Sequence, residues 1–257
     1  MEYILKFIKY RGLINELVSR DLKVKYRRSA LGYIWTVLSP LLMMAVMAVV
    51  FSYFFRYEIQ NYTVYLLSGQ LIFNFYSEAT NNAMSSIINS RSLINKVHVP
   101  KYIFPLSRVM SAFVNLLFSL IAILIMLIIT KSTIYPTVFL FPLPLIYLFL
   151  ISLGIGLILS VLTVFFRDVY YIYSVILTAL MYFTPIFYPV SILPDYAMNL
   201  MKFNPLYHVV NMFRNCLLYG KFPTLSENLI CLIMGLGLTC VGLLIFKKKQ
   251  DNFVMYI

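Results

Sequence analysis

The chain has 257 residues, of which 61% are hydrophobic and only 12% are charged, and its mean hydropathy is +0.86. A soluble domain carries about 25% charged residues, so this composition excludes an ordinary water-soluble globule and favours an integral membrane protein. The formal net charge of +12 would suit a nucleic-acid partner, but the basic residues cluster at the ends of apolar runs, so we expect no such partner.

A basic segment, residues 1–28, precedes the first long apolar run. Large apolar residues recur at helical spacing within residues 3–18, with charged residues between them. This pattern predicts an amphipathic helix in the cytoplasmic interface, followed by a basic linker. Basic residues interrupt the first apolar stretch and no small-residue cleavage site follows, so we expect no cleaved signal peptide.

Long apolar segments dominate the rest of the chain. A helix needs about 20 apolar residues to cross a bilayer core of roughly 30 Å. Six segments meet this requirement, and strict alternation of apolar and polar residues is absent, which favours helices over a β-barrel. The sequence therefore predicts an all-α integral membrane protein with six transmembrane helices in a single domain, residues 1–257. The predicted spans are residues 33–55, 62–84, 106–130, 138–165, 170–189 and 227–246.

The basic residues also predict an orientation. With six spans both termini lie on one side, and that side then carries sixteen of the 21 Lys and Arg residues, against five on the other. Loops rich in Lys and Arg stay in the cytoplasm. We therefore expect a multi-pass membrane protein with both termini in the cytoplasm.

Residues 192–221 lie between the fifth and sixth predicted spans. They are too polar for a clean span and too apolar for a free loop. Asn204 suits the N-cap of a helix, Pro205 its first position, and Gly220 the position after its last turn. The preceding stretch "PDYAMNLMKF" favours a second short helix. We expect a re-entrant helical hairpin that dips back from the outer surface.

No group of residues has the pattern of an enzyme site. The two histidines, His98 and His208, are far apart in the predicted topology, and the acidic residues are scattered. The cysteines lack the paired spacing of a metal site, and no Gly-rich phosphate loop occurs. We therefore expect no catalytic residue, metal or cofactor in this chain, and any work must draw energy from a partner.

Two pairs of charged residues lie at or near the inner ends of spans, where charge is costly and needs a partner. Glu78 lies in the inner half of the second span and Arg108 near the inner start of the third. These spans are antiparallel neighbours, so we expect a structural ion pair between the two. Arg167 and Asp168 share the inner turn before the fifth span, which Asp168 is expected to cap.

Aromatic residues make up 17% of the chain. Tyr33 and Trp35 lie just past the first basic cluster, and Tyr53 lies in an aromatic run near the other end of the same span. Interface anchoring or lipid-facing packing is the main interpretation. Contact with the C–H faces of sugar rings is the alternative.

Four stretches resemble one family, in the order found there. "RDLKVKYRRSALGYIWTVLSPLL" resembles the entry to the first span in permease subunits of bacterial polysaccharide ABC exporters. "INKVHVPKYIFPLSRV" resembles their cytoplasmic loop, "FFRDV" their turn before the fifth span, and "FNPLYHVVNMFRNCLLYGKFP" their outer re-entrant region. The likeness covers nearly the whole chain. Such permeases export O-antigen, teichoic acid and related lipid-linked glycans.

The resemblance implies a homodimeric channel that works with two copies of a separate ABC ATPase, on which ATP and Mg²⁺ bind. It also implies transport of a lipid-linked glycan outward across the bacterial inner membrane, with the first and fifth spans lining the channel. Residues 192–221, with Asn204, Pro205 and Arg214, would form an outer gate. Arg27 and Arg28 are candidates for contact with the carrier diphosphate, and a role in setting the topology is the alternative. The candidate substrate or carrier contacts are Arg27, Arg28, Tyr33, Trp35 and Tyr53.

By the same resemblance, residues 90–100 would be a coupling helix on the ATPase. The sequence supports an apolar face with a charged rim on a short helix ended by Pro100. An exposed Leu93–Ile94 pair is the feature that a simple basic loop would not explain. The predicted contact residues are Arg91, Leu93, Ile94, Lys96 and Val97.

Two other functions remain open. A permease for drugs or small hydrophobic molecules would share the broad fold. A membrane glycosyl- or acyltransferase is disfavoured, because the acid/base cluster that such chemistry requires is missing.

Overall fold

The computed structural model describes residues 10–27, 29–55, 59, 61–94, 96 and 99–256, without the side chains of 26, 51–55 and 254. These residues form helices joined by turns and irregular segments, and no strand occurs among them. The α-helices are α2 (Arg11–Tyr26), α3 (Trp35–Phe55), α4 (Tyr62–Asn89), α5 (Arg91–Ile94), α6 (Ile103–Ile129), α7 (Pro142–Phe165), α8 (Val169–Phe183), α9 (Asp195–Met201), α10 (Pro205–Leu217), α11 (Leu225–Lys249) and α12 (Phe253–Tyr256). Short 3-10 turns are η1 (Gly32–Ile34), η2 (Pro136–Leu140), η3 (Val190–Ile192) and η4 (Gln250–Asn252).

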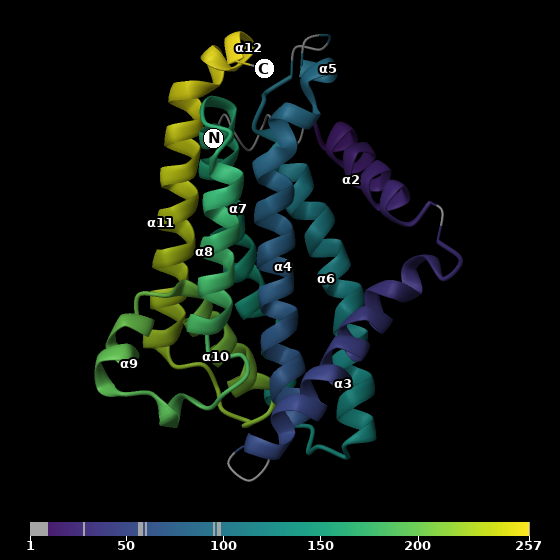
Figure 1. Ribbon diagram of the computed structural model, residues 1–257, viewed down its shortest axis with the longest axis vertical. Coiled ribbons are helices and arrows are strands. Elements are labelled where there is room, and N and C mark those ends of the chain that lie inside the picture. The colour runs from purple at the N-terminus through teal and green to yellow at the C-terminus, as the bar shows by residue number, and fades with distance from the viewer. Residues whose placement is uncertain are drawn as a thin grey trace.

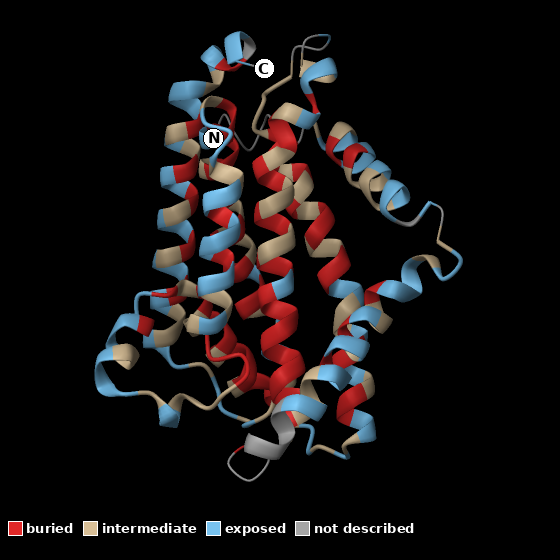
Figure 2. Cartoon of the chain, in the orientation of Figure 1, coloured by how far each residue is buried: buried red, intermediate tan, exposed pale blue. Residues whose placement is uncertain are grey.

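The long helices α4, α6, α7, α8 and α11 run along one axis of the molecule, and α3 crosses them obliquely (Figure 1). The short helices α5 and α12 lie at one end of this bundle, and α9 and α10 lie at the other. α4 is the central helix: it packs against α3, α6, α7 and α10. It is buried along most of its length (Figure 2).

Four helical segments of the described chain are long and apolar enough to cross a membrane. They match the first, third, fourth and sixth predicted spans. α4 has 28 residues, about 42 Å of helix, but the polar residues of its second half set it apart from these four. α8 has 15 residues, fewer than the roughly 20 that a bilayer requires. The four segments are Gly32–Val50, Ile103–Ile129, Pro136–Phe165 and Leu225–Asn252.

α8 ends earlier than the predicted fifth span, residues 170–189. Its last helical residue is Phe183, and Thr184 follows in an extended conformation with φ −85° and ψ 132°. Pro185 disfavours helical geometry at the residue before it, which explains the break. The chain therefore continues from α8 as irregular backbone.

α2 differs from the predicted amphipathic helix in its position and surroundings. Residues 1–9 of that prediction lie outside the described residues. α2 begins at Arg11 and continues to Tyr26, so the expected basic linker is mostly helical. Ile14 and Leu17 are buried, in a cluster with Ile103 of α6. The apolar face of the described part therefore packs on protein, because α6 offers it an apolar surface.

α7 and α11 approach each other closely because glycines line their contact. A Cβ added at Gly154 would lie 2.6 Å from the Leu238 carbonyl oxygen and from the Thr239 nitrogen. The Thr239 hydroxyl donates to the Leu150 carbonyl across the same contact, at 2.8 Å. Small residues permit such close approach between membrane helices.

Gly154→Ala tests this contact. The added methyl group has backbone on its far side, so the two helices must separate, and we expect a destabilisation of about 1–3 kcal/mol. Heating the detergent-solubilised protein and measuring the fraction that stays monodisperse checks it. Gly237→Ala on α11 is the matched control, because a Cβ there meets nothing within 4 Å. Equal heat resistance of the two variants would contradict the close contact.

Candidate functional site

Polar groups gather at two places inside the helix bundle. The first surrounds Arg214 of α10, and we call it the arginine site. The second lies where α4 and α6 face α2 and the start of α3, and we call it the polar seam. Both lie within a largely apolar bundle, where an unpaired polar group is costly.

Local sequence explains why α10 forms and presents Arg214 to the interior. The Asn204 side chain accepts a hydrogen bond from the Leu206 backbone nitrogen at 3.0 Å, and Pro205 occupies the first turn. Both predictions for these residues are confirmed. One face of the helix is buried, and Arg214 lies on it with 3% of its surface exposed.

The Arg214 guanidinium binds backbone carbonyls. It donates to the carbonyl oxygens of Pro185 at 2.7 Å, Tyr65 at 3.0 Å and Ile186 at 3.2 Å. It also lies 3.4 Å from the centre of the Tyr65 ring. No acidic residue among those the structure describes forms an ion pair with Arg214. Burial lowers the pKa of Arg214, and the carbonyl dipoles offset that cost for a group that stays charged.

Tyrosines of α4 complete the arginine site. The Tyr62 hydroxyl donates to the Phe187 carbonyl at 2.8 Å, and the Tyr65 hydroxyl donates to the Tyr188 carbonyl at 2.8 Å. Four consecutive carbonyls after α8, those of residues 185–188, thus accept hydrogen bonds from side chains of α4 and α10. Gly69 of α4 makes room, since a Cβ there would lie 2.7 Å from the Arg214 Nη2 atom.

The polar seam follows from helical spacing on two neighbouring helices. Residues three or four positions apart share a helix face, so each helix presents one polar stripe. α4 contributes Asn74, Glu78 and Asn82, and α6 contributes Arg108, Ser111, Asn115 and Ser119.

α2 supplies the opposite charges of the seam. Lys25 Nζ lies 2.7 Å from Glu78 Oε1, and Arg108 Nη1 lies 2.8 Å from Asp21 Oδ1. The predicted ion pair between Glu78 and Arg108 is therefore wrong, because α2 packs along α6 and offers each charge a partner. Asn115 also donates to Glu78 at 2.8 Å. These contacts join α2 to both long helices.

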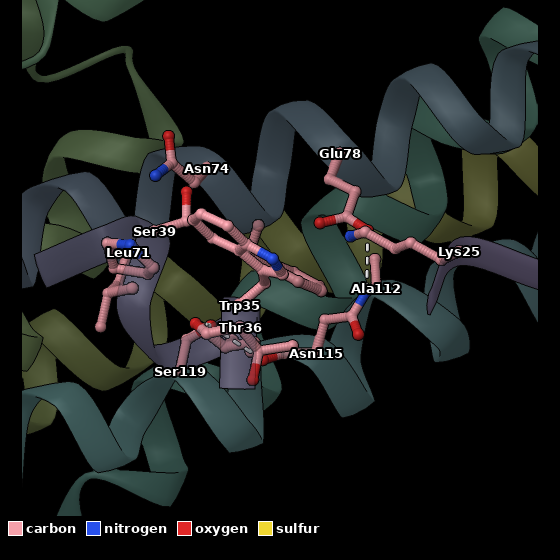
Figure 3. A pocket seen from close by; sticks show the side chains of 13 residues that line it. Lys25, Trp35, Thr36, Ser39, Leu71, Asn74, Glu78, Ala112, Asn115 and Ser119 are labelled. Carbon is pink, nitrogen blue, oxygen red and sulfur yellow. Dashed lines mark hydrogen bonds and ion pairs between the residues drawn. The ribbon is translucent and has the colours of Figure 1, made fainter. Parts of the chain in front are cut away.

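Two pockets lie along the seam. One, of about 310 Å³, lies between the start of α3 and the middle of α4 and α6, and we call it the Trp35 pocket. Figure 3 shows the Trp35 indole between Asn74 and Glu78 of α4 and Asn115 and Ser119 of α6. The second, of about 400 Å³, adjoins α2 and shares Lys25, Glu78 and Asn115 with the first. Both volumes are typical of small-molecule sites.

Of the predicted substrate contacts that the structure describes, only Trp35 lines this pocket. Tyr33 lies nearby, with its ring centre 6.0 Å from that of Phe118, and it does not line the pocket. Arg27 is exposed beyond the end of α2. Arg28 and the Tyr53 side chain lie outside the described residues.

The loop predicted for coupling contains α5, a helix of four residues that ends at Ile94, well before Pro100. Arg91 and Lys96 are exposed. Leu93 and Ile94 are half-buried against the cluster around Ile103, so the expectation of an exposed apolar pair is wrong. The short connection between α4 and α6 folds these side chains onto the helix ends. Val97 lies outside the described residues.

Arg167 and Asp168 are exposed in the turn between α7 and α8. Asp168 occupies the N-cap position of α8, but its side chain makes no capping hydrogen bond, so that prediction is wrong. Its backbone is helical, with φ −64° and ψ −17°. An N-cap side chain reaches the next amides from an extended backbone, which Asp168 does not adopt.

Reactive groups are sparse in the part of the chain that the structure describes. No cluster of three or more His, Cys, Asp or Glu residues there is arranged to hold a metal. Burial raises the pKa of the Cys216 thiol to about 11, so this cysteine stays protonated and packs as an apolar residue.

Residues 13–218 match the family model described as ABC-2 type transporter. The chain belongs to this family, and the resemblance found from its motifs is confirmed.

The chain is similar to several export permeases along nearly its whole length. It is 31% identical over 246 residues to the O-antigen export system permease protein RfbA of Klebsiella pneumoniae, covering 94% of this chain and 93% of that protein. It is 29% identical to the protein of the same name in Myxococcus xanthus, with 95% of each covered. It is 24% identical to the polysialic acid transport protein KpsM of Escherichia coli, with 93% of each covered.

Substitutions at Arg214 test the arginine site. Arg214→Met removes a donor from three buried carbonyls, those of Tyr65, Pro185 and Ile186, and we expect a loss of at least about 2 kcal/mol. Arg214→Lys keeps the charge but reaches fewer carbonyls, so its loss should be smaller. The melting temperature in detergent checks both. Arg167→Gln is the matched control, because Arg167 is exposed, and a loss equal to that of Arg214→Met would contradict this account.

Proposed function

We propose that this chain is the permease subunit of an ATP-driven exporter that moves a lipid-linked polysaccharide from the cytoplasmic to the outer side of the membrane. The observation that carries the proposal is similarity over nearly the whole chain to O-antigen and polysialic acid permeases. The polar seam supports it, because a hydroxyl-rich cargo needs polar groups at membrane depth. O-antigen, teichoic acid and similar surface glycans are the candidate cargoes.

The proposed exporter contains two copies of this chain and two copies of a separate ABC ATPase. ATP and Mg²⁺ bind on the ATPase, because this chain's sequence contains no phosphate-binding loop. α3 and α8 carry large exposed apolar residues such as Val49 and Tyr171. Lipid or the second copy would cover these faces.

The proposed topology has six crossings and cytoplasmic termini. α4 would be the second crossing, and α8 together with the irregular segment that follows Phe183 would be the fifth. α11 ends in Lys247, Lys248 and Lys249, at the end of the bundle where α5 carries Arg91 (Figure 1). This excess of basic residues supports a cytoplasmic location for that end. α9 and α10 then lie at the outer end, where they would form the re-entrant hairpin and gate. The loop around α5 would contact the ATPase through its exposed basic residues.

The main competing function is a permease for drugs or small hydrophobic molecules. The polar seam disfavours it, because amides, hydroxyls and paired charges are poor partners for an apolar cargo. A membrane transferase would need a general acid or base. The carboxylates of the seam, Asp21 and Glu78, are held in ion pairs.

Deletion of the gene in its host tests the function. We expect the surface polysaccharide to disappear while lipid-linked glycan accumulates inside the cell, since synthesis continues without export. Gel analysis of surface and intracellular glycan measures this, and complementation with the wild-type gene is the control. Unchanged surface glycan would contradict the proposal, and loss without intracellular accumulation would favour a biosynthetic enzyme.

Cysteine labelling tests the topology. In a background with the three native cysteines replaced by serine, Lys131→Cys and Lys221→Cys should react with a membrane-impermeant maleimide in intact cells. Lys96→Cys and Lys248→Cys should react only after permeabilisation, because they lie at the basic end. Reaction of Lys96→Cys in intact cells would overturn the six-crossing arrangement.

A further inference from the structure

We propose that the Trp35 pocket is a sugar-binding site that holds one pyranose unit of the exported glycan. The proposal rests on the proposed function and adds a place within the protomer where the glycan is held. The pocket lies between the start of α3 and the middle of α4 and α6, so a sugar there would lie away from the ends of the long helices (Figure 3).

The pocket contains polar groups that no other part of the described structure uses. Asn115 is 6% exposed, and its Oδ1 atom is buried without a hydrogen-bond partner, although its Nδ2 atom donates to Glu78. The side chains of Asn74 and Ser39 line the same pocket and make no hydrogen bond to any described residue. A buried carbonyl oxygen without a donor is destabilising. A ligand hydroxyl would remove that cost.

The ion pairs that join α2 to α4 and α6 do not explain why these polar groups are present. That contact uses Asp21 with Arg108 and Lys25 with Glu78. Asn74 of α4 and Ser39 of α3 take no part in that contact, and both line the Trp35 pocket. The free donors and acceptors therefore belong to the pocket itself.

The charges of the seam favour a neutral ligand over the phosphate of a lipid carrier. A phosphate site presents cations in excess of carboxylates. Among the residues that the structure describes, Lys25 is the only cation that lines the Trp35 pocket, and Glu78 lies 2.7 Å from it. The neighbouring pair, Arg108 with Asp21, is likewise balanced. Amide and hydroxyl groups remain as the available partners, and they match the hydroxyls of a sugar.

Trp35 supplies the apolar wall that such a ligand requires. It lines the pocket and is 40% exposed, so its indole is not covered by the rest of the chain. The C–H face of a pyranose ring packs on an aromatic face, while its hydroxyls turn to amides and hydroxyls at the rim. Trp35 is also the only tryptophan of the chain.

Tryptophan fluorescence of the full-length chain in detergent therefore reports on this pocket alone. The probes are D-glucose, D-galactose, D-mannose, L-rhamnose and N-acetyl-D-glucosamine, each titrated to 200 mM, with sodium pyrophosphate as the anionic comparison. We expect a saturable change in Trp35 emission with at least one sugar and none with pyrophosphate. In Asn74→Leu, affinity for that sugar should fall about tenfold, since a hydrogen-bonding group is lost.

Asn81→Leu is the matched control, because Asn81 lies on the same helix and lines neither pocket of the seam. It should bind the sugar as the wild type does. The proposal is overturned if no sugar gives a saturable change, if pyrophosphate alone does so, or if the two variants bind equally. If the titration fails while deletion still abolishes surface glycan, only the sugar site is wrong. If surface glycan does not depend on the chain, the proposed function is wrong.

Discussion

The carbonyl groups of the backbone between α8 and η3 need hydrogen-bond donors, and the packing at one end of this protein depends on supplying them. Pro185 ends helical geometry there, and four successive carbonyls lose their partners in an apolar bundle, where an unsatisfied carbonyl is costly. The Arg214 guanidinium serves the first two, and the hydroxyls of Tyr62 and Tyr65 serve the others. One charged side chain thus holds α4, α10 and the irregular segment together.

α4 connects this end of the molecule to the polar seam. Its first turns carry Tyr62 and Tyr65, and its middle carries Asn74 and Glu78. Because it meets polar partners along its length, α4 is buried yet less apolar than its neighbours. The same helix is therefore held at one end by the arginine site and carries the polar groups of the proposed sugar site further along. A transport subunit needs both properties, since a cargo site must be held by a stable frame.

The sequence predicts the features that depend on local or averaged chemistry. Hydropathy locates the long apolar helices, and the Asn204–Pro205 pair marks the start of α10 because capping acts within one turn. Prediction from the sequence fails where the partner of a side chain depends on how helices pack against one another. Glu78 and Arg108 form ion pairs with residues of α2, and the spacing of residues along a helix cannot predict these partners. Arg214 binds backbone carbonyls. Every residue carries such a carbonyl, so no sequence motif identifies the ones that Arg214 binds. Asp168 fails as a cap because its backbone is helical.

Hydrogen exchange of the purified full-length chain, read by mass spectrometry, tests the arginine site most directly. The amides of Ile186, Phe187 and Tyr188 lie in irregular backbone, which ordinarily exchanges quickly. We predict that they exchange far more slowly than those of residues 190–193, and that Arg214→Lys removes much of this difference. Equally fast exchange of both segments in the wild type would contradict the claim that Arg214 fixes this end of the bundle.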